Sequence, residues 1–171
     1  MRQSKTNSSY IAVKKSSIHS RGIFAKKDIP QGARIIEYVG EKVTKAQALK
    51  RADIPIGRNS KDARHGAVYL FELNKRYDID GDVYYNTARY INHSCEPNCE
   101  TEIIRGRIWI IAIRDIKNGE EVSYDYGYGW ADYKDHPCRC RTVSCIGYIL
   151  AREHWSRLKK RSFPRIGTEG M

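Results

Sequence analysis

The chain has 171 residues, of which 40% are apolar and 30% are charged, and its formal net charge is +11. This length suits one domain with its own core, and the composition excludes a disordered, collagenous or low-complexity chain. The longest apolar run, residues 108–113, is far shorter than the roughly 18–20 residues that a bilayer crossing needs, and residues 1–10 are polar. We therefore predict a soluble protein with no membrane span and no secretory signal.

The positive charge gathers at the two ends of the chain. Residues 1–30 carry +6 and residues 151–171 carry +4, whereas residues 31–150 carry only +1. A basic end favours contact with nucleic acid or another polyanion. Solvated basic termini explain the pattern equally well, so both interpretations stay open.

Strands dominate the predicted elements. In chain order, the β-branched and aromatic runs are residues 10–13, 34–39, 68–73, 102–104, 108–113 and 121–124. A helix is predicted after Thr44, because Thr44 and Gln47 form a capping box and Pro55 stops the helix. Residues 53–66 are predicted to form a polar loop, and residues 151–160 a second helix. The predicted fold class is mostly β with short helices.

One pattern occurs twice. Residues 25–32 and 112–119 share A-x-x-D-I-x-x-G, and each copy leads into a strand. Two copies do not make a repeat array. We expect the same turn chemistry at two places in one sheet.

All five cysteines lie beyond residue 94: they are Cys95, Cys99, Cys138, Cys140 and Cys145. An odd count without a secretory signal argues against a disulfide framework. The spacing C-x-C-x4-C in a tight loop favours three thiolates directed at a tetrahedral zinc ion, with Cys95 or Cys99 as the fourth ligand. Small cysteines packed in a core are the alternative, which the arginines and proline beside them disfavour.

Three segments hold the remaining chemistry. In residues 20–24, a glycine ahead of an apolar strand allows the backbone to approach a ligand, although a plain turn gives the same pattern. Residues 92–95, N-H-S-C, are typical of a metal site or a Cys–His pair. Adjacent side chains on an extended segment face opposite ways, which places His93 badly for activating Cys95. Residues 124–130 form an aromatic cluster separated by glycines.

The order of the motifs resembles that of the SET-domain protein lysine methyltransferases, in the compact stand-alone form with a post-SET zinc loop. The shared motifs are R-G-I-F, E-Y-V-G-E, Y-L-F, R-Y-I-N-H-S-C-x-P-N-C, S-Y-D-Y and C-x-C-x4-C, from about residue 18 to residue 150. The resemblance implies a SET-domain fold, several small curved sheets around a knot-like threading. It divides the chain into a basic N-terminal segment (1–17), a SET domain (18–130), a post-SET zinc loop (131–150) and a basic C-terminal helix and tail (151–171).

The resemblance also implies roles for single residues. The implied cofactor is S-adenosylmethionine, with contacts from Arg21, Gly22, Ile23, Phe24, Asn92, His93, Tyr126, Tyr148 and Leu150. Tyr126 is the implied catalytic tyrosine, and the implied walls of a channel for the substrate lysine are Tyr69, Phe71 and Tyr124. The implied ligands of a structural zinc ion are Cys95, Cys138, Cys140 and Cys145, which leaves Cys99 as a spare thiol.

Three positions depart from the family pattern. Ser20, Tyr85 and Arg141 stand where the family commonly has glycine. Because glycine reaches backbone conformations that other residues avoid, each departure predicts a local change of backbone that bears on cofactor affinity.

The implied reaction is methyl transfer to a lysine of a histone or histone-like basic protein, with a monomethyl or dimethyl product. A free lysine has a pKa of about 10.4, and an aromatic channel beside a sulfonium disfavours the charged amine. Two alternatives are a non-chromatin substrate such as a ribosomal protein, and a non-catalytic zinc module that binds nucleic acid. The implied place is intracellular: the nucleus or chromatin in a eukaryote, otherwise the cytoplasm or a host nucleus.

Two charged segments are candidate contacts for partners. Asp78, Asp80 and Asp82 recur at period two, so they would share one strand face and receive a basic peptide, or form an acidic turn without a ligand. Basic residues of the predicted C-terminal helix are placed to touch DNA or to face solvent. The sequence gives no indication of the oligomeric state.

Overall fold

The computed structural model describes residues 5–52, 69–131 and 133–162. Its strands are β1 (Ile11–Lys15), β2 (Arg21–Ala25), β3 (Arg34–Tyr38), β4 (Glu41–Thr44), β5 (Leu70–Glu72), β6 (Tyr77–Asp80), β7 (Asn92–His93), β8 (Cys99–Ile104), β9 (Arg107–Ala112) and β10 (Glu121–Tyr124). The helices are α1 (Lys45–Ala52) and α2 (Trp155–Ser162), with short 3-10 helices η1 (Thr87–Tyr90), η2 (Tyr133–Asp135) and η3 (Arg152–His154). The prediction of a mostly β fold with short helices is confirmed.

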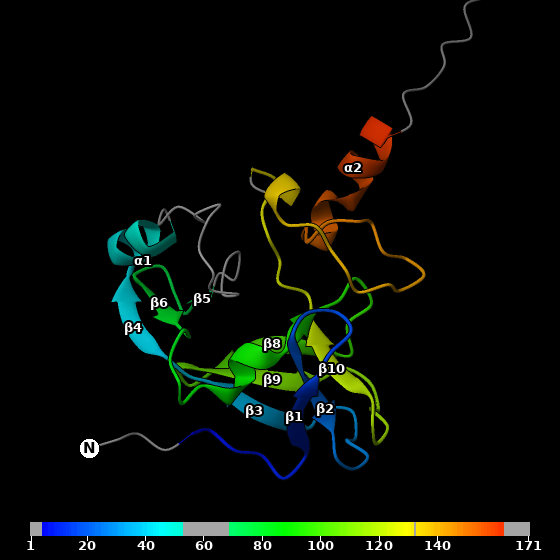
Figure 1. Cartoon of the computed structure of the whole chain (residues 1–171). Coiled ribbons are helices and arrows are strands. Elements are labelled where there is room, and N and C mark those ends of the chain that lie inside the picture. Colours follow the sequence, from blue (N-terminus) through cyan, green and yellow to red (C-terminus); the bar gives the residue numbers. More distant parts are fainter. Residues whose placement is uncertain (1–4, 53–68, 132, 163–171) are drawn as a thin grey trace, which may run out of the picture.

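Two sheets make up the body of the domain (Figure 1). The larger sheet has the order β1-β2-β10-β8-β9-β3, with β7 also paired to β10, and the smaller sheet has the order β4-β6-β5. Strand β10 is antiparallel to β2 but parallel to β7 and β8. This arrangement brings residues 92–93 directly beside residues 123–124.

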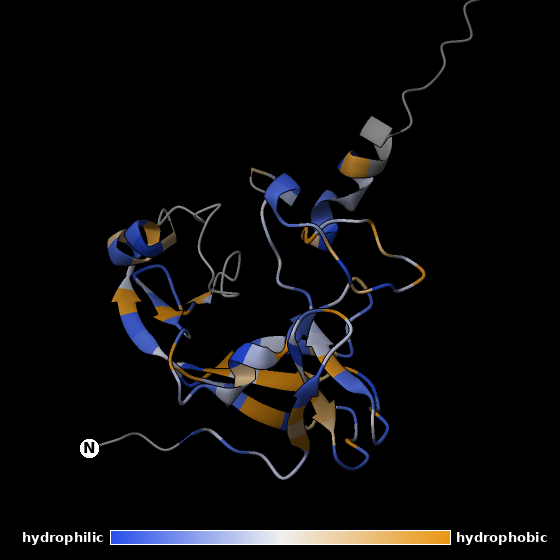
Figure 2. Cartoon of the chain, in the orientation of Figure 1, coloured by the Kyte–Doolittle hydropathy of each residue, from blue (hydrophilic) through white to orange (hydrophobic). Residues whose placement is uncertain are grey.

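The main core lies against the larger sheet and follows the alternation of its strands. Ile23, Ile110 and Val122 have no exposed surface, whereas Trp109 on the other face of β9 is half-buried. Figure 2 shows β9 as a mainly apolar strand. Because β-branched side chains fit a pleated surface, this isoleucine-rich pattern forms strands.

The twice-occurring pattern forms a paired turn. Ile29 and Ile116 exchange two backbone hydrogen bonds, of 2.8 and 2.9 Å. Asp28 and Asp115 each accept a backbone N–H of the other copy, at 2.9 Å in both cases. The two copies thus complete each other's turns, which confirms the prediction of shared turn chemistry in one sheet.

Helix α1 begins as its capping box predicts. The Thr44 amide donates to Gln47 Oε1 at 2.9 Å, and the Gln47 amide donates to Thr44 Oγ1 at 3.3 Å. Pro55 and the predicted loop at residues 53–66 lie outside the described residues. The prediction of a regular helix from residue 151 is wrong at its start: Ala151 offers no capping side chain, so the first turn is η3 and α2 begins only at Trp155.

A second, smaller core lies among the described residues that follow β10. Its buried residues are Tyr133, Leu150 and Leu158, with Trp130, Ile146, Tyr148 and Trp155 packed around them. Helix α2 therefore rests on residues 130–150 and belongs to the same unit (Figure 1). Within the described residues, neither helix has the length and apolar character needed to span a bilayer.

Candidate active site and metal centre

Two hydrogen bonds fix Tyr126, which lies just after β10: one is made by its side chain and one by its backbone. The Tyr126 hydroxyl donates to the Ile91 carbonyl at 2.8 Å, and its backbone N–H donates to His93 Nδ1 at 3.2 Å. Burial lowers the pKa of His93, although Asp125 opposes this effect. A neutral imidazole with Nδ1 as acceptor fits both observations.

Tyr126 belongs to a run of aromatic side chains that we call the aromatic row. Neighbouring ring centroids lie 5.2, 6.1, 5.0 and 5.9 Å apart along the series Tyr38, Phe71, Tyr124, Tyr126 and Tyr128. Burial raises the pKa values of Tyr124 and Tyr126 well above 10, so both hydroxyls stay protonated. The row therefore offers apolar ring faces with a few hydroxyl groups and no phenolate.

Tyr69 is attached to this row at its edge. Its carbonyl accepts the Tyr38 hydroxyl at 2.9 Å, and the Arg89 guanidinium lies 4.5 Å from its ring centroid. The structure therefore brings together all four residues of the predicted catalytic group, Tyr69, Phe71, Tyr124 and Tyr126. It adds Tyr38, which the E-Y-V-G-E motif contained without indicating a role.

A cavity of about 350 Å³ adjoins the aromatic row. Ile18, His19, Asn92, His93 and Tyr126 line one side, and residues 135–139 with Ile149 line the other. The cavity thus lies between the body of the domain and the segment that carries the last three cysteines. Tyr126 lines the cavity and is also a member of the aromatic row, so the cavity and the row meet at this residue.

Three of the nine predicted cofactor contacts, Asn92, His93 and Tyr126, line this cavity. Ile23 and Leu150 have no exposed surface and pack in the two cores. Arg21, Phe24 and Tyr148 are not among its lining residues, and their side chains contact Tyr90, Lys14 and Tyr133, respectively.

Strand β2 reaches the site through its backbone. The Arg21 carbonyl accepts the Asn92 side-chain amide at 3.0 Å. A methyl group at Gly22 would overlap Glu121 Oε1 and lie 2.9 Å from Ser16 Cβ. Glycine is therefore required here by close approach.

Two of the three departures from the family pattern keep a backbone that favours glycine. Ser20 has φ +36° and Arg141 has φ +59°, both in the left-handed region. Tyr85 has no positive φ, and its carbonyl accepts the Thr6 amide at 2.8 Å. Ser20 and Arg141 therefore adopt conformations that are strained for residues other than glycine.

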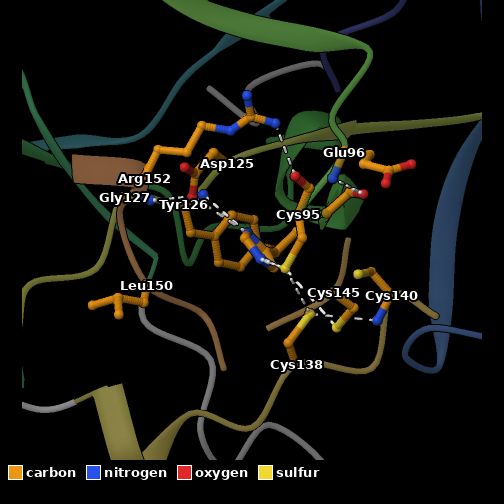
Figure 3. Close-up of polar contacts among 12 residues, drawn as sticks. Cys95, Glu96, Asp125, Tyr126, Gly127, Cys138, Cys140, Cys145, Leu150 and Arg152 are labelled. Atoms are coloured by element: carbon orange, nitrogen blue, oxygen red, sulfur yellow. Dashed lines mark hydrogen bonds and ion pairs between the residues drawn. The ribbon is translucent and has the colours of Figure 1, made fainter. Parts of the chain in front are cut away.

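Four thiols converge beside the cavity (Figure 3). The Sγ atoms of Cys95, Cys138, Cys140 and Cys145 all lie within 4.8 Å of one another. Cys95 Sγ is 3.7 Å from Cys138 Sγ and 4.0 Å from Cys145 Sγ. A tetrahedral Zn–S₄ site with bonds of about 2.3 Å has S···S separations of about 3.8 Å, so the cluster could hold zinc.

The remaining thiol, Cys99, lies in the main core. It starts β8 and pairs with Tyr124, and burial raises its pKa to about 12. The geometry therefore selects Cys95 rather than Cys99 for the cluster. Within the cluster, burial opposes ionisation of Cys140, but the Thr142 hydroxyl and nearby hydrogen bonds lower its pKa to about 6.

The expectation that His93 is badly placed for Cys95 is wrong. Cys95 Sγ lies 3.7 Å from His93 Nε2, because residues two apart on an extended segment share a face. Burial nevertheless raises the pKa of Cys95 to about 12. That environment does not suit a thiolate nucleophile, and the role of Cys95 in the cluster explains its position better.

Two polar contacts attach residues 144–152 to the turn that carries Cys95 and Glu96, and Figure 3 shows the one between Arg152 and Cys95. Arg152 donates to the Cys95 carbonyl at 3.1 Å, and Glu96 Oε1 accepts the Ser144 amide at 2.9 Å. Arg152 also lies 5.2 Å from the Trp155 ring, and Arg157 lies 4.0 Å from the Trp130 ring. Arg152 and Arg157 are therefore engaged by the protein itself.

The three aspartates predicted as a candidate contact for a basic peptide, here called the acidic row, form ion pairs within the protein. Asp78, Asp80 and Asp82 each form an ion pair, and their partners are Lys45, Arg51 and Arg89. A basic peptide would have to displace these side chains. The row is better explained as the link between β6, α1 and η1.

The SET domain family model matches residues 20–127 of the chain. The chain belongs to the SET domain family. It is 36% identical over 149 residues to "Histone-lysine N-methyltransferase trithorax" of Drosophila virilis, covering 85% of this chain and 4% of that protein. It is 38% identical over 141 residues to "Histone-lysine N-methyltransferase, H3 lysine-4 specific" of Aspergillus oryzae, covering 79% and 11%.

A third relative, "Histone-lysine N-methyltransferase 2B" of Homo sapiens, is 35% identical over 150 residues, covering 85% of this chain and 5% of that protein. The chain thus spans between 4% and 11% of the length of these three relatives. The family membership confirms the predicted SET-domain fold, and the four-cysteine cluster agrees with a post-SET loop.

Proposed function

We propose that this SET domain is a protein-lysine N-methyltransferase that uses S-adenosylmethionine. The observation that carries the proposal is the position of Tyr126, which lines the cavity on one side and joins the aromatic row on the other. A methyl donor in the cavity and a lysine side chain along the row would meet at this residue. The names of the relatives support the same reaction class.

The lining of the cavity fits the cofactor. It combines amide, imidazole and carboxylate groups with apolar surface from Ile18, Tyr126 and Ile149, which suits a ligand with a charged amino-acid part and an aromatic base. S-adenosylmethionine would supply an electrophilic methyl group on its sulfonium. We assign its binding to Asn92, His93 and Tyr126 through side chains, and to Arg21 and Gly22 through the adjacent backbone.

The aromatic row would prepare the lysine. Burial among Phe71, Tyr124 and Tyr126 removes water from the ammonium and favours the neutral amine, which is the nucleophile. The raised pKa values of both tyrosines rule against a phenolate base, so the Tyr126 hydroxyl orients the reacting groups. Tyr69, beside Tyr38, would form the end of this lysine-binding surface.

We propose monomethyl product with some dimethyl product. Tyr124 occupies the position two residues before Tyr126, where a hydroxyl or a water that it holds would fill the space a methylated nitrogen needs. Its ring is 8% exposed and lies 5.0 Å from the Tyr126 ring, so the row has little room at this point.

We propose a structural zinc ion for Cys95, Cys138, Cys140 and Cys145. The four-thiol donor set and the Sγ separations fit tetrahedral zinc. The ion would fasten residues 138–145 to the N-H-S-C segment and so hold residues 135–139 over the cavity.

For the substrate, we propose a histone, and therefore a place at chromatin. The relatives' names refer to histone lysine methylation. Exposed Lys14 and Lys15 on β1 are available to the phosphates of nucleosomal DNA, whereas Arg152 and Arg157 are engaged by the protein.

The direct test is methyl transfer from labelled S-adenosylmethionine to separated core histones and to whole-cell lysate. We expect label in a histone band. Tyr126→Phe should reduce the rate at least about a hundredfold, as expected when one well-placed polar group is lost, while S-adenosylhomocysteine still binds. Label only in a non-histone protein would overturn the substrate, and wild-type turnover by Tyr126→Phe would overturn the site.

A further inference from the structure

The Glu121 carboxylate lies where three segments of the chain meet. It accepts the Asn92 side-chain amide at 2.7 Å and the Ser16 hydroxyl at 2.8 and 2.9 Å. Glu121 starts β10, Asn92 belongs to β7, and Ser16 precedes the loop into β2. These contacts join residues up to 105 positions apart in the sequence.

The carboxylate and the Arg21 carbonyl together fix which way the Asn92 amide faces. A carboxylate only accepts hydrogen bonds, so Asn92 must present its NH₂ group to Glu121. The same NH₂ group donates to the Arg21 carbonyl at 3.0 Å and contacts Ser16 Oγ at 3.2 Å. Asn92 also lines the cavity, so its amide oxygen is the polar atom left for a ligand there.

Glu121 also shapes the edge of the cavity through Ser16. Ser16 Oγ donates to Glu121 and accepts the Ile18 amide at 2.9 Å, and the Ser16 amide donates to the Ser20 carbonyl at 3.3 Å. Ile18 and His19 line the cavity. Because Ser20 is held at φ +36°, this loop needs an external anchor, and the carboxylate provides it.

We propose that Glu121 is a positioning residue for ligand binding in the cavity. It turns the Asn92 amide oxygen toward the cavity, where that oxygen accepts a hydrogen bond from a cationic amino group. This inference rests on the proposed function, because the amino group is that of the cofactor's amino-acid part. Neither Glu121 nor Ser16 contacts the ligand in this role.

The test compares Glu121→Gln with Glu120→Gln. Glutamine keeps the size of the side chain but can offer its own NH₂ group to Asn92, so the stronger of the two acceptors that fix the Asn92 amide is lost and the amide oxygen is held less firmly toward the cavity. Glu120 is the adjacent residue on the chain, and its side chain pairs with Arg114 outside the site, so the same chemical change there is the matched control. Both proteins are examined as the full chain with zinc supplied.

Calorimetry with two ligands separates positioning from general damage. S-adenosylhomocysteine carries the amino group, whereas 5′-deoxy-5′-methylthioadenosine has the same nucleoside without the amino-acid part. We expect Glu121→Gln to bind S-adenosylhomocysteine about tenfold more weakly, the effect of losing one charge-assisted hydrogen bond, and to bind methylthioadenosine within about twofold of wild type. Glu120→Gln should match wild type for both ligands.

Hydrogen exchange of the ligand-free protein gives a readout independent of the cofactor. Glu121→Gln should speed exchange of the Ser16 and Ile18 amides, and Glu120→Gln should not. Equal weakening for both ligands would show a structural effect only and overturn the proposal, as would unchanged binding by Glu121→Gln. If wild type itself does not bind S-adenosylhomocysteine, the proposed function fails first, and this result is distinct from either of the others.

Discussion

Gly81 tests whether the aromatic row depends on close packing behind it. A methyl group added at Gly81 would lie 2.5 Å from Tyr38 Cε1 and closer still to Cζ and Oη. The Tyr38 ring is 4% exposed and its hydroxyl is held by the Tyr69 carbonyl, so the ring has no free direction in which to move. Gly81→Ala must therefore displace Tyr38 and with it Tyr69.

The cost follows from two contributions. Overpacking a buried site costs about 1–3 kcal/mol, and losing the Tyr38–Tyr69 hydrogen bond costs about 1 kcal/mol. A total near 3 kcal/mol lowers the melting temperature of a domain of this size by about 6–12 °C. Because Tyr38 and Tyr69 belong to the side of the site that we propose for the lysine, kcat/KM for a peptide should also fall, whereas affinity for S-adenosylhomocysteine should change little.

The assays are thermal unfolding and steady-state kinetics, with Gly129→Ala as the control. Gly129 is exposed, has no atom within 4 Å of the added methyl group and has no left-handed φ, so its substitution should change stability by no more than about 0.5 kcal/mol. Equal melting temperatures for the two variants would refute the packing argument. A destabilised Gly81→Ala with normal peptide kinetics would refute the link between Tyr38 and the lysine side.

Three further outcomes are expected. Tyr124→Phe should retain activity and add more methyl groups per lysine. If mass spectrometry finds an unchanged product, a residue other than Tyr124 limits the number of methyl groups added. Cys138→Ser should lose the bound zinc and destabilise residues 131–162, whereas Cys99→Ser should keep one zinc per chain in metal analysis; zinc retained by Cys138→Ser would reject the ligand set. The rate on a peptide should rise with pH toward the lysine pKa of about 10.4 and should not fall below pH 10 through Tyr126, whose raised pKa keeps its hydroxyl protonated; a descending limb that Tyr126→Phe removes would contradict this.

Local sequence signals were sufficient to predict the elements whose structure depends mainly on residues close by in the sequence. The capping box placed the start of α1, and the β-branched and aromatic runs placed β10 at residues 121–124 and β9 within one residue at each end. The doubled A-x-x-D-I-x-x-G pattern indicated shared turn chemistry, although only the structure shows that the two copies pair with each other. These features depend on contacts within a few residues, or on one motif used twice.

The choice between Cys95 and Cys99 could not be made locally, because both lie near the N-H-S-C segment. The register of β8 decides it. Cys99 starts β8 opposite Tyr124 and Ala112, so its thiol is enclosed by the sheet, whereas Cys95 lies in the turn before the strand and meets the distant loop. Only the resemblance to a family supplied this choice from the sequence.

The side chains that sequence reasoning missed act over long separations. Glu121 meets Ser16 across 105 residues, and Tyr38 meets the Tyr69 carbonyl across 31. A carboxylate before a strand and a tyrosine within one are ordinary surface and core residues by pattern alone. Their roles arise from the order of strands in the sheet, which composition and periodicity do not specify.

Strand β10 and its continuation contribute residues both to the proposed cofactor side and to the proposed lysine side of the site. Alternation along β10 and its continuation places Val122, Tyr124 and Tyr126 in one series, which runs from the core into the aromatic row. Glu121 and Asp125, in the other series, contact Asn92 and His93 beside the cavity. Because β7 pairs in parallel with this strand, any shift of β10 would move both sides together. In the function that we propose, the distance between methyl donor and lysine would therefore be set by the pleat of a single strand, and substitutions that loosen β7–β10 pairing should damage turnover more than either binding step.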